Sequence, residues 1–250
     1  MKKTILITGA TDGIGLETAR RLVEQGHHVL LHGRNTIKLN NVESQLAVAN
    51  KENNIIEGYV ADLSNMQDVL GLAQAVKEKH NKIDVLINNA GIFRTNNPLT
   101  ADGLDVRFLV NTLAPYLLMH KLLPVINTSG RVVNLSSAAQ APINIDALTG
   151  KATLADMDAY AQSKLAITMW SRTMGLALKD QGPLIVSVNP GSLLATKMVK
   201  EGFGVAGNDI GIGADILIRA ALSDEFNERW GAYFDNDSHC CPVNFHIRLI

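Results

Sequence analysis

A tyrosine and a lysine four residues apart, Tyr160 and Lys164, are the pair best suited to chemistry in this sequence. Residues at this spacing share one face of a helix, and the surrounding pattern is helical. A cation beside a phenol favours the phenolate and lowers the pKa of the tyrosine, so Tyr160 could exchange a proton with a substrate oxygen. The alternative is an ordinary surface pair, because chance alone supplies this spacing about 0.2 times in such a chain.

Two further features could act on a substrate or a phosphate. Ser136 and Ser137 end a predicted strand, where a hydroxyl could polarise a carbonyl, although serines after a strand are more often turn residues. Gly9, Gly13 and Gly15 lie where a short apolar strand turns into a helix. Glycine lets the backbone approach a phosphate, and the helix end offers free N–H donors, so this turn predicts nucleotide binding; the alternative is a plain tight turn.

Two charged residues follow the next strands and bear on the choice of nucleotide. Arg34 follows the second strand, where the adenosine ribose of a dinucleotide would lie. An arginine there favours the 2′-phosphate of NADP over the free ribose of NAD, unless it is simply a solvated side chain. Asp62 follows the third strand and could accept a hydrogen bond from the adenine amino group, or could serve as a carboxylate at a helix N-terminus.

The elements that must position these residues alternate between short β-branched runs and longer helical patterns. We predict strands over 4–8, 28–32, 55–60, 84–88, 131–135 and 184–189. We predict helices that include 14–25, 65–79, 104–126 and 158–179. Continuous apolar strands joined by helices predict an α/β fold with a doubly wound parallel sheet, a Rossmann fold, in a single domain over 1–250.

Long irregular segments and the composition complete this prediction. Residues 138–157 and 192–213 are expected to be substrate loops beside the crevice, and the tail 238–250 has no assigned role. A net charge of −1 argues against nucleic-acid or anionic membrane partners, and no window is apolar enough to predict a transmembrane segment. The only cysteines, Cys240 and Cys241, are adjacent, which suits a reducing compartment and predicts a cytoplasmic location without a metal site.

The order of the motifs resembles that of the classical short-chain dehydrogenases/reductases over about residues 3–234. The landmarks are Gly9, Gly13, Gly15, Asp62, Asn88 to Gly91, Asn111, Ser136 and Ser137, Tyr160 and Lys164, and Pro190 and Gly191. The resemblance implies a Rossmann fold and hydride transfer between a nicotinamide and a carbonyl or alcohol. The 23 positions between Ser137 and Tyr160, together with Arg34, make the chain most similar to the NADP-preferring, retinol-dehydrogenase-like branch.

Roles follow from this resemblance by position. Tyr160 is the general acid/base, Lys164 lowers its pKa and holds the nicotinamide ribose, Ser137 binds the substrate oxygen, and Asn111 anchors a water of a proton relay. The implied contacts with NADP(H), with NAD(H) as the alternative, are Gly9, Thr11, Asp12, Gly13, Ile14, Gly15, Arg34, Asn35, Asp62, Leu63, Asn89, Ala90, Gly91, Tyr160, Lys164, Pro190, Gly191, Leu193 and Thr196.

The function that the sequence predicts is an NADP(H)-dependent carbonyl reductase or alcohol dehydrogenase acting on a small molecule. Two other functions fit the same residues: a non-catalytic NADP(H)-binding regulator, and a reductase of an activated carbon–carbon double bond. The family often pairs subunits through helices corresponding to 104–126 and 158–179, so a homo-oligomer is expected from the resemblance only.

Overall fold

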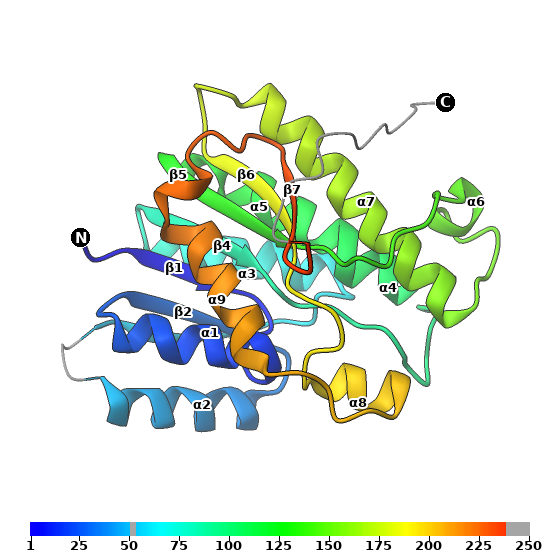
Figure 1. The fold of residues 1–250 in the computed structure, drawn as a ribbon, viewed down its shortest axis with the longest axis horizontal. Helices are drawn as coiled ribbons and strands as arrows, with labels where there is room; N and C mark the ends of the chain where they lie inside the picture. Colours follow the sequence, from blue (N-terminus) through cyan, green and yellow to red (C-terminus); the bar gives the residue numbers. More distant parts are fainter. Residues whose placement is uncertain (51–53, 239–250) are drawn as a thin grey trace.

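A computed structural model of the chain describes residues 1–50 and 54–238. In this part, seven strands form one parallel sheet in the order β3-β2-β1-β4-β5-β6-β7 (Figure 1). The strands are β1 (Thr4–Ile7), β2 (His28–Gly33), β3 (Ile56–Val60), β4 (Ile83–Asn88), β5 (Ile126–Leu135), β6 (Leu184–Asn189) and β7 (Tyr233–Asp235). The strand order reverses between β1 and β4, which is where doubly wound sheets open a crevice for a ligand. The predicted fold is confirmed.

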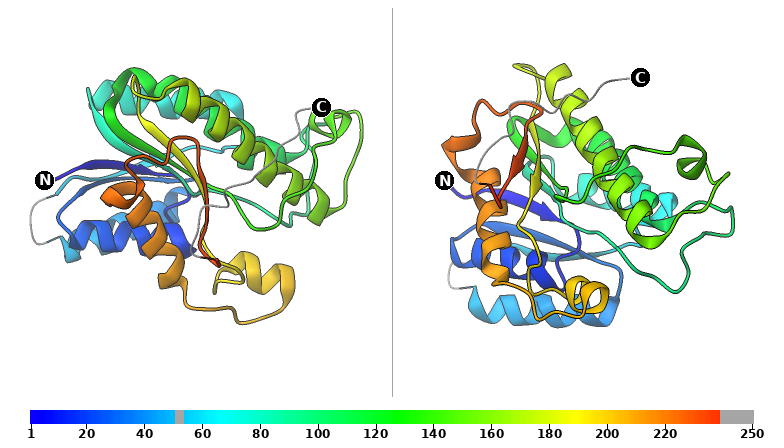
Figure 2. Two further views of the ribbon diagram at one scale, coloured as in Figure 1. Left: turned by 45° about the horizontal axis from the view of Figure 1, so that its top comes forward. Right: turned by 45° about the vertical axis from the view of Figure 1, so that its right-hand side comes forward.

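Helices cover both faces of this sheet (Figures 1 and 2). The longer helices are α1 (Gly13–Glu24), α2 (Thr36–Ala49), α3 (Met66–Lys79), α5 (Ala114–Leu122), α7 (Asp156–Ala177) and α9 (Ile210–Leu222). The shorter ones are α4 (Val106–Phe108), α6 (Ile145–Leu148) and α8 (Lys197–Phe203). Helices α1, α2 and α9 pack on one face, and α3, α5 and α7 on the other.

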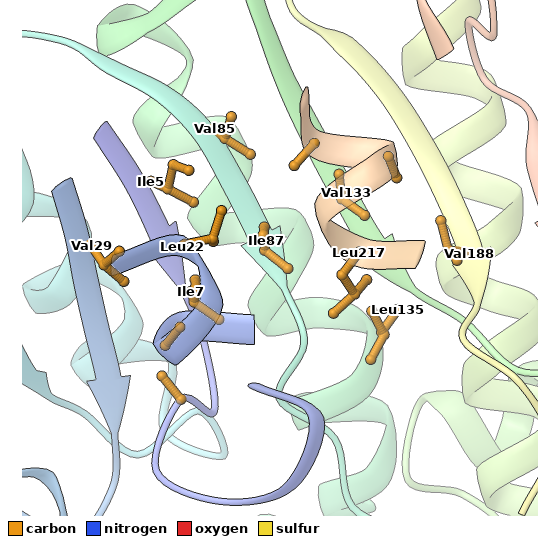
Figure 3. Close-up of a cluster of buried hydrophobic side chains, with 14 of the residues drawn as sticks. Ile5, Ile7, Leu22, Val29, Val85, Ile87, Val133, Leu135, Val188 and Leu217 are labelled. Carbon is orange, nitrogen blue, oxygen red and sulfur yellow. The ribbon is translucent and has the colours of Figure 1, made fainter. Parts of the chain in front are cut away.

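The core consists of two apolar layers, one on each side of the sheet. Side chains alternate between them along a strand: Ile5 and Ile7 face the layer of α1 and α9, whereas Leu6 faces the layer of α3 and α5. Figure 3 shows the first layer, where Leu22 of α1 and Leu217 of α9 contact the strand side chains. Burial on both faces explains why these strands read as continuous apolar runs.

Several boundaries differ from the sequence prediction. Strand β7 was not predicted, because three residues form no recognisable run. The predicted helix 104–126 is divided into α4, a π-helix (Leu109–Leu113), α5 and a 3₁₀ turn, and its last residue, Ile126, already belongs to β5. The substrate loops contain structure that was not predicted: α6 lies within 138–157, and α8 and the start of α9 lie within 192–213.

Among the described residues, one helical stretch, Val106–Val125, is long and apolar enough to cross a membrane by length and composition. Its buried side explains that composition, because Leu118, Met119 and Leu122 are fully buried against the sheet. The absence of a membrane-spanning segment stays a prediction. The cytoplasmic location also stays a prediction. Cys240 and Cys241, on which it rests, and the rest of the tail beyond Ser238 lie outside the described residues.

Candidate active site

We call the turn between β1 and α1, residues 8–15, the phosphate turn. Its geometry requires its glycines. Gly9 and Gly13 have φ angles of +66° and +58°, a region that favours glycine. A Cβ atom on Gly15 would lie 2.3 Å from the carbonyl oxygen of Gly9, and one on Gly9 would lie 2.9 Å from Cα of Ala90. The backbone can thus come close to a ligand here, and the N-terminus of α1 faces the same place. The turn fits the pyrophosphate of a dinucleotide.

The segment after β4 braces the phosphate turn. The side-chain amide of Asn89 donates to the carbonyls of Thr8 and Gly9 at 2.9 and 3.0 Å, and the N–H of Ala90 donates to Oγ1 of Thr8 at 3.1 Å. Gly91 lies farther along, and a Cβ built on it would be 3.4 Å from both Lys164 Nζ and Asn111 Oδ1. This segment therefore joins the phosphate turn to the predicted catalytic residues.

The residues after β2 lie beside the phosphate turn. A Cβ on Gly33 would lie 2.5 Å from the methyl group of Thr11, so the two segments touch. Arg34 is exposed and forms none of the ion pairs found in the described part of the chain. Asn35 caps α2, because its Oδ1 accepts from the N–H of Lys38 at 2.9 Å. An unpaired cation at this position fits a 2′-phosphate.

The residues after β3, 61–64, form what we call the adenine loop. Asp62 is exposed, and its Oδ1 accepts from the N–H and the hydroxyl of Ser64 at 2.9 and 2.8 Å. Asp62 does not cap α3, since the capping residue is Asn65. These two bonds use only one of its carboxylate oxygens, and the contact with the adenine amino group stays a prediction. The side chain of Leu63 is buried in the core, so only its backbone could meet a cofactor.

Ser137, Tyr160 and Lys164 meet at the carboxyl end of β5. Nζ of Lys164 donates to the carbonyl of Leu135 at 2.7 Å and lies 5.7 Å from the centre of the Tyr160 ring. The side chain of Ser137 lies near the Tyr160 phenol and acts to lower the pKa of Tyr160. Ser136 points elsewhere: its hydroxyl donates to the carbonyl of Lys164 at 3.0 Å, inside the packing of α7. Of the two serines, only Ser137 faces the tyrosine.

Burial dominates the electrostatics of the pair. It raises the pKa of Tyr160, against the opposite effect of Ser137, and it lowers the pKa of Lys164 to about 8. Lys164 is not among the causes that shift the pKa of Tyr160, and the lowering of that pKa by Lys164 stays a prediction. Lys164 is 3% exposed, so its ammonium is held in a poorly solvated position with one backbone acceptor.

Asn111 lies in the π-helix between α4 and α5, a type of local irregularity that is frequent at functional sites. Both N–H groups of its side-chain amide are used: Nδ2 donates to the carbonyl of Ile92 and to the hydroxyl of Ser163, and Oδ1 accepts from the N–H of Ile92 at 2.8 Å. Asn111 thus joins the segment after β4 to α7. Its role in holding a relay water stays a prediction.

The segment after β6 reaches back to the phosphate turn. Gly191 has a φ of +120° and Leu193 one of +52°, and Leu193 is 44% exposed. The backbone carbonyl of Pro190 accepts a hydrogen bond from Asn236 at 3.1 Å. Thr196 caps α8, and its methyl group lies 3.6 Å from the Cβ position of Gly13. Thr196 is therefore close to the predicted pyrophosphate site.

The substrate loop 138–157 contacts α7, which carries Tyr160, and the loop 192–213 contacts Phe93, which packs against Tyr160. Helices α6 and α8 of these loops lie beyond the carboxyl ends of the strands (Figure 1). Phe93 packs against Tyr160 with ring centres 5.2 Å apart and stacks on Phe203 of α8 at 5.6 Å. The other loop is fixed to α7 by a 2.8 Å bond from the N–H of Asn144 to Gln162. Two aromatic rings thus form an apolar wall next to the reactive phenol.

Three residues near the site were missed by the sequence prediction. Phe93 follows the Asn88 to Gly91 motif by two positions, which is the one signal that pointed to it. His32 and Arg107 had no signal, because their contacts join residues far apart in the chain. No cluster of three or more metal-binding side chains occurs among the described residues, and the prediction of no metal stays a prediction.

Known proteins resemble the chain over most of its length. The sequence profile of the family described as short chain dehydrogenase matches residues 3–203. The chain is 32% identical to polyprenol dehydrogenase of Homo sapiens, covering 94% of this chain and 77% of that protein. It is 34% identical to retinol dehydrogenase 12 of Bos taurus, covering 80% and 64%. It is also 31% identical to the chloroplastic short-chain dehydrogenase TIC 32 A of Brassica napus, covering 98% and 83%.

Solved structures share the fold. A short-chain dehydrogenase from Shigella flexneri in complex with NADP has a TM-score of 0.74 at 26% identity and covers 94% of this chain and 97% of that chain. A short-chain dehydrogenase from Sphingobium yanoikuyae in complex with NADPH has a TM-score of 0.71 at 25% identity, covering 87% and 84%. Both are complexes with a phosphorylated nicotinamide cofactor.

Proposed function

This chain belongs to the short-chain dehydrogenase family and is similar to its retinol dehydrogenases, and we propose that it transfers a hydride between NADP(H) and a carbonyl or alcohol carbon. The observation that carries this proposal is the meeting of Ser137, Tyr160 and Lys164 at the end of β5. The phosphate turn lies next to them, joined through Gly91. A hydride donor bound along this crevice would end beside the phenol.

NADP(H) supplies or accepts the hydride when it is bound. In the reducing direction, Tyr160 gives its phenol proton to the substrate oxygen, and in the oxidising direction it takes that proton away. Ser137 donates a hydrogen bond to the same oxygen and fixes its position. Lys164 uses one ammonium donor on Leu135, so two remain for the ribose beside the nicotinamide. We assign the relay-water role to Asn111.

The preference for NADP(H) rests on Arg34. This exposed arginine directly follows Gly33, which touches Thr11 of the phosphate turn, and its guanidinium can form charge-assisted hydrogen bonds with a 2′-phosphate. The NADP and NADPH complexes of the related structures support the same choice. NAD(H) is then the weaker ligand, because it leaves this cation without its partner.

The substrate is a small molecule, as in the rest of the family. We propose that its apolar part lies against Phe93 and Phe203, the rings packed near Tyr160. A homo-oligomer is proposed from the family alone; the exposed Tyr116 of α5 and Leu176 of α7 are apolar side chains available on the two helices concerned.

The proposal is tested by titrating the protein with NADPH and NADH and then screening ketones and aldehydes for loss of NADPH absorbance. We expect tighter binding of NADPH and turnover of at least one carbonyl compound. Binding without turnover across a broad panel would instead favour a regulator that binds NADP(H). No binding of either cofactor would contradict the interpretation of the phosphate turn.

A further inference from the structure

A buried histidine connects three segments that line the predicted cofactor site. His32, in β2, is 3% exposed. Its Nδ1 lies 3.2 Å from the N–H nitrogen of Gly9 in the phosphate turn, and its Nε2 lies 3.0 Å from the carbonyl oxygen of Ala61 in the adenine loop. Its own carbonyl accepts from the N–H of Ala10 at 2.9 Å. One residue therefore contacts the neighbouring segments on both sides of β2.

These partners assign a single state to the imidazole. A backbone N–H can only donate and a backbone carbonyl only accepts, so Nδ1 must be bare and Nε2 must carry the proton. Burial lowers the pKa of His32, outweighing the opposite effects of the bond to Ala61 and of the charge on Asp62, and this favours the same neutral form. The ring is thus a rigid spacer with an acceptor at one end and a donor at the other.

The His32 ring lies where the two strands next to β2 end. The N–H of Thr8 still bonds to β4, whereas the next N–H, that of Gly9, bonds to the imidazole. On the other side, the carbonyl of Ala61 lies one residue past the end of β3. The imidazole therefore continues the hydrogen bonding at the place where both neighbouring strands have ended. It holds the chain where it leaves the sheet toward the ligand.

We propose that His32 is a positioning residue for NADP(H), which fixes the phosphate turn and the adenine loop at a set separation across β2. The inference rests on the proposed cofactor, although the hydrogen bonds themselves are made within the protein. A leucine at position 32 would preserve apolar volume and leave the N–H of Gly9 and the carbonyl of Ala61 without partners. The phosphate turn would then sample other positions.

The first test compares His32→Leu with the wild type by fluorescence titration of NADPH and by steady-state kinetics. Loss of two buried hydrogen bonds is expected to weaken NADPH binding about 10- to 100-fold. The KM for NADPH should rise by a similar factor while kcat at saturating NADPH stays nearly constant, because the residue does not touch the reacting atoms. A purely structural residue would lower the amount of folded protein without this split.

Two conservative variants keep the test valid if His32→Leu folds poorly. The amide oxygen of His32→Asn can take the place of Nδ1 and accept from Gly9, and the amide nitrogen of His32→Gln can take the place of Nε2 and donate to Ala61. Each should recover part of the lost affinity, with the larger recovery in the asparagine variant, since Gly9 belongs to the phosphate turn itself. No recovery by either variant would contradict the spacer role.

The matched control is His28→Leu. His28 lies on the same strand, and its Nδ1 also accepts a backbone N–H, that of Ile55, at 2.7 Å, but it lies at the opposite end of the sheet from the cofactor. This variant should keep the wild-type KM for NADPH. An equal rise of the KM in both variants would mean that the effect is a general loss of stability in β2.

A measurement without cofactor separates this inference from the proposed function. Hydrogen exchange of the Gly9 amide should become at least about 10-fold faster in His32→Leu and should be unchanged in His28→Leu. If the wild type binds no NADPH, the proposed function fails, and this exchange still decides whether His32 fixes the turn. Unchanged exchange and unchanged NADPH affinity in His32→Leu would overturn the inference while leaving the enzyme proposal standing.

Discussion

The junction between α4 and α7 and the candidate active site at the end of β5 each contain a buried cation, in opposite surroundings. Arg107 at the junction is 1% exposed and forms ion pairs with Asp105, at 2.6 Å, and with Asp156. Lys164 at the end of β5 is almost as buried, yet it contacts a backbone carbonyl and forms none of the ion pairs of the described residues. The buried charge of Arg107 is thus paired with carboxylates, whereas that of Lys164 is not.

The pKa directions follow this difference. Burial disfavours the guanidinium of Arg107, but the hydrogen bonds and charges of Asp105 and Asp156 outweigh it, so its pKa is raised. Burial acts on Lys164 without such compensation and lowers its pKa to about 8. A paired charge joins two helices, whereas an unpaired one costs stability. Such a cost is typical of sites kept for function, which agrees with the proposed roles of Lys164 in binding the cofactor and in controlling Tyr160.

The largest expected effect is on catalysis at the unpaired cation. Lys164→Met should lower kcat/KM by about 10²- to 10⁴-fold, because Tyr160 loses the charge that favours its phenolate and the cofactor ribose loses its donor. The free energy of unfolding should change much less, since the variant also removes a desolvated charge. Steady-state kinetics and urea unfolding measure the two quantities. A fully active variant would remove Lys164 from the mechanism.

The paired cation should give the reverse result. Arg107→Met leaves Asp105 buried without its partner, so the free energy of unfolding should fall by about 3–5 kcal/mol. Activity per folded molecule should decline less than in Lys164→Met. Asp156→Asn is the milder control, because this carboxylate is 45% exposed and Arg107 keeps Asp105. Equal stability of Arg107→Met and the wild type would contradict the structural role.

The pH dependence of stability should distinguish the two sites more finely. Below pH 8, Lys164 is charged in both the folded and the unfolded chain; between pH 8 and its ordinary pKa of 10.5, only the unfolded chain keeps the proton. The free energy of unfolding should therefore rise with pH, by about 2 kcal/mol between pH 7.5 and 9.5. The raised pKa of Arg107 adds nothing in this range. Urea unfolding of wild type and Lys164→Met should show the rise in the wild type alone.

A third cation, the exposed Arg34, should affect neither stability nor the chemical step. Arg34→Asp is expected to lower the preference for NADPH over NADH by roughly 10-fold or more, because the charge-assisted bonds to the 2′-phosphate are replaced by repulsion. Binding titrations with both cofactors measure the ratio. An unchanged ratio would mean that Arg34 does not contact the phosphate.

The sequence predicted the sheet well because its central strands are buried on both faces. Ile5, Leu6 and Ile7 must be apolar whichever way they point, so the run is visible without a structure. Strand β7 has no such run, and its three residues are held by pairing with β6. The π-helix around Asn111 is equally invisible, since its apolar spacing is that of an ordinary helix.

The sequence predicted those site residues that come directly after a recognisable strand, as Ser137 comes after β5 and the phosphate turn after β1. The choice of Ser137 over Ser136 came from a family resemblance, and its physical reason, the bond of Ser136 into α7, required the structure. Arg107 and Asp156 are 49 positions apart, and His32 bonds to residues 23 and 29 positions away. No local pattern encodes such contacts, so these residues could not be found from the sequence.

The proposed reaction is the transfer of a hydride from NADPH, bound beside Lys164, to a carbonyl carbon, with Tyr160 supplying the proton. It is tested most directly with NADPH deuterated at the transferred position of the nicotinamide and a ketone that the protein reduces. We predict an alcohol with deuterium on the carbinol carbon, and at least about 100-fold slower formation by Tyr160→Phe with nearly unchanged NADPH affinity. Deuterium on a carbon of a reduced double bond, or equal rates for the wild type and Tyr160→Phe, would contradict it.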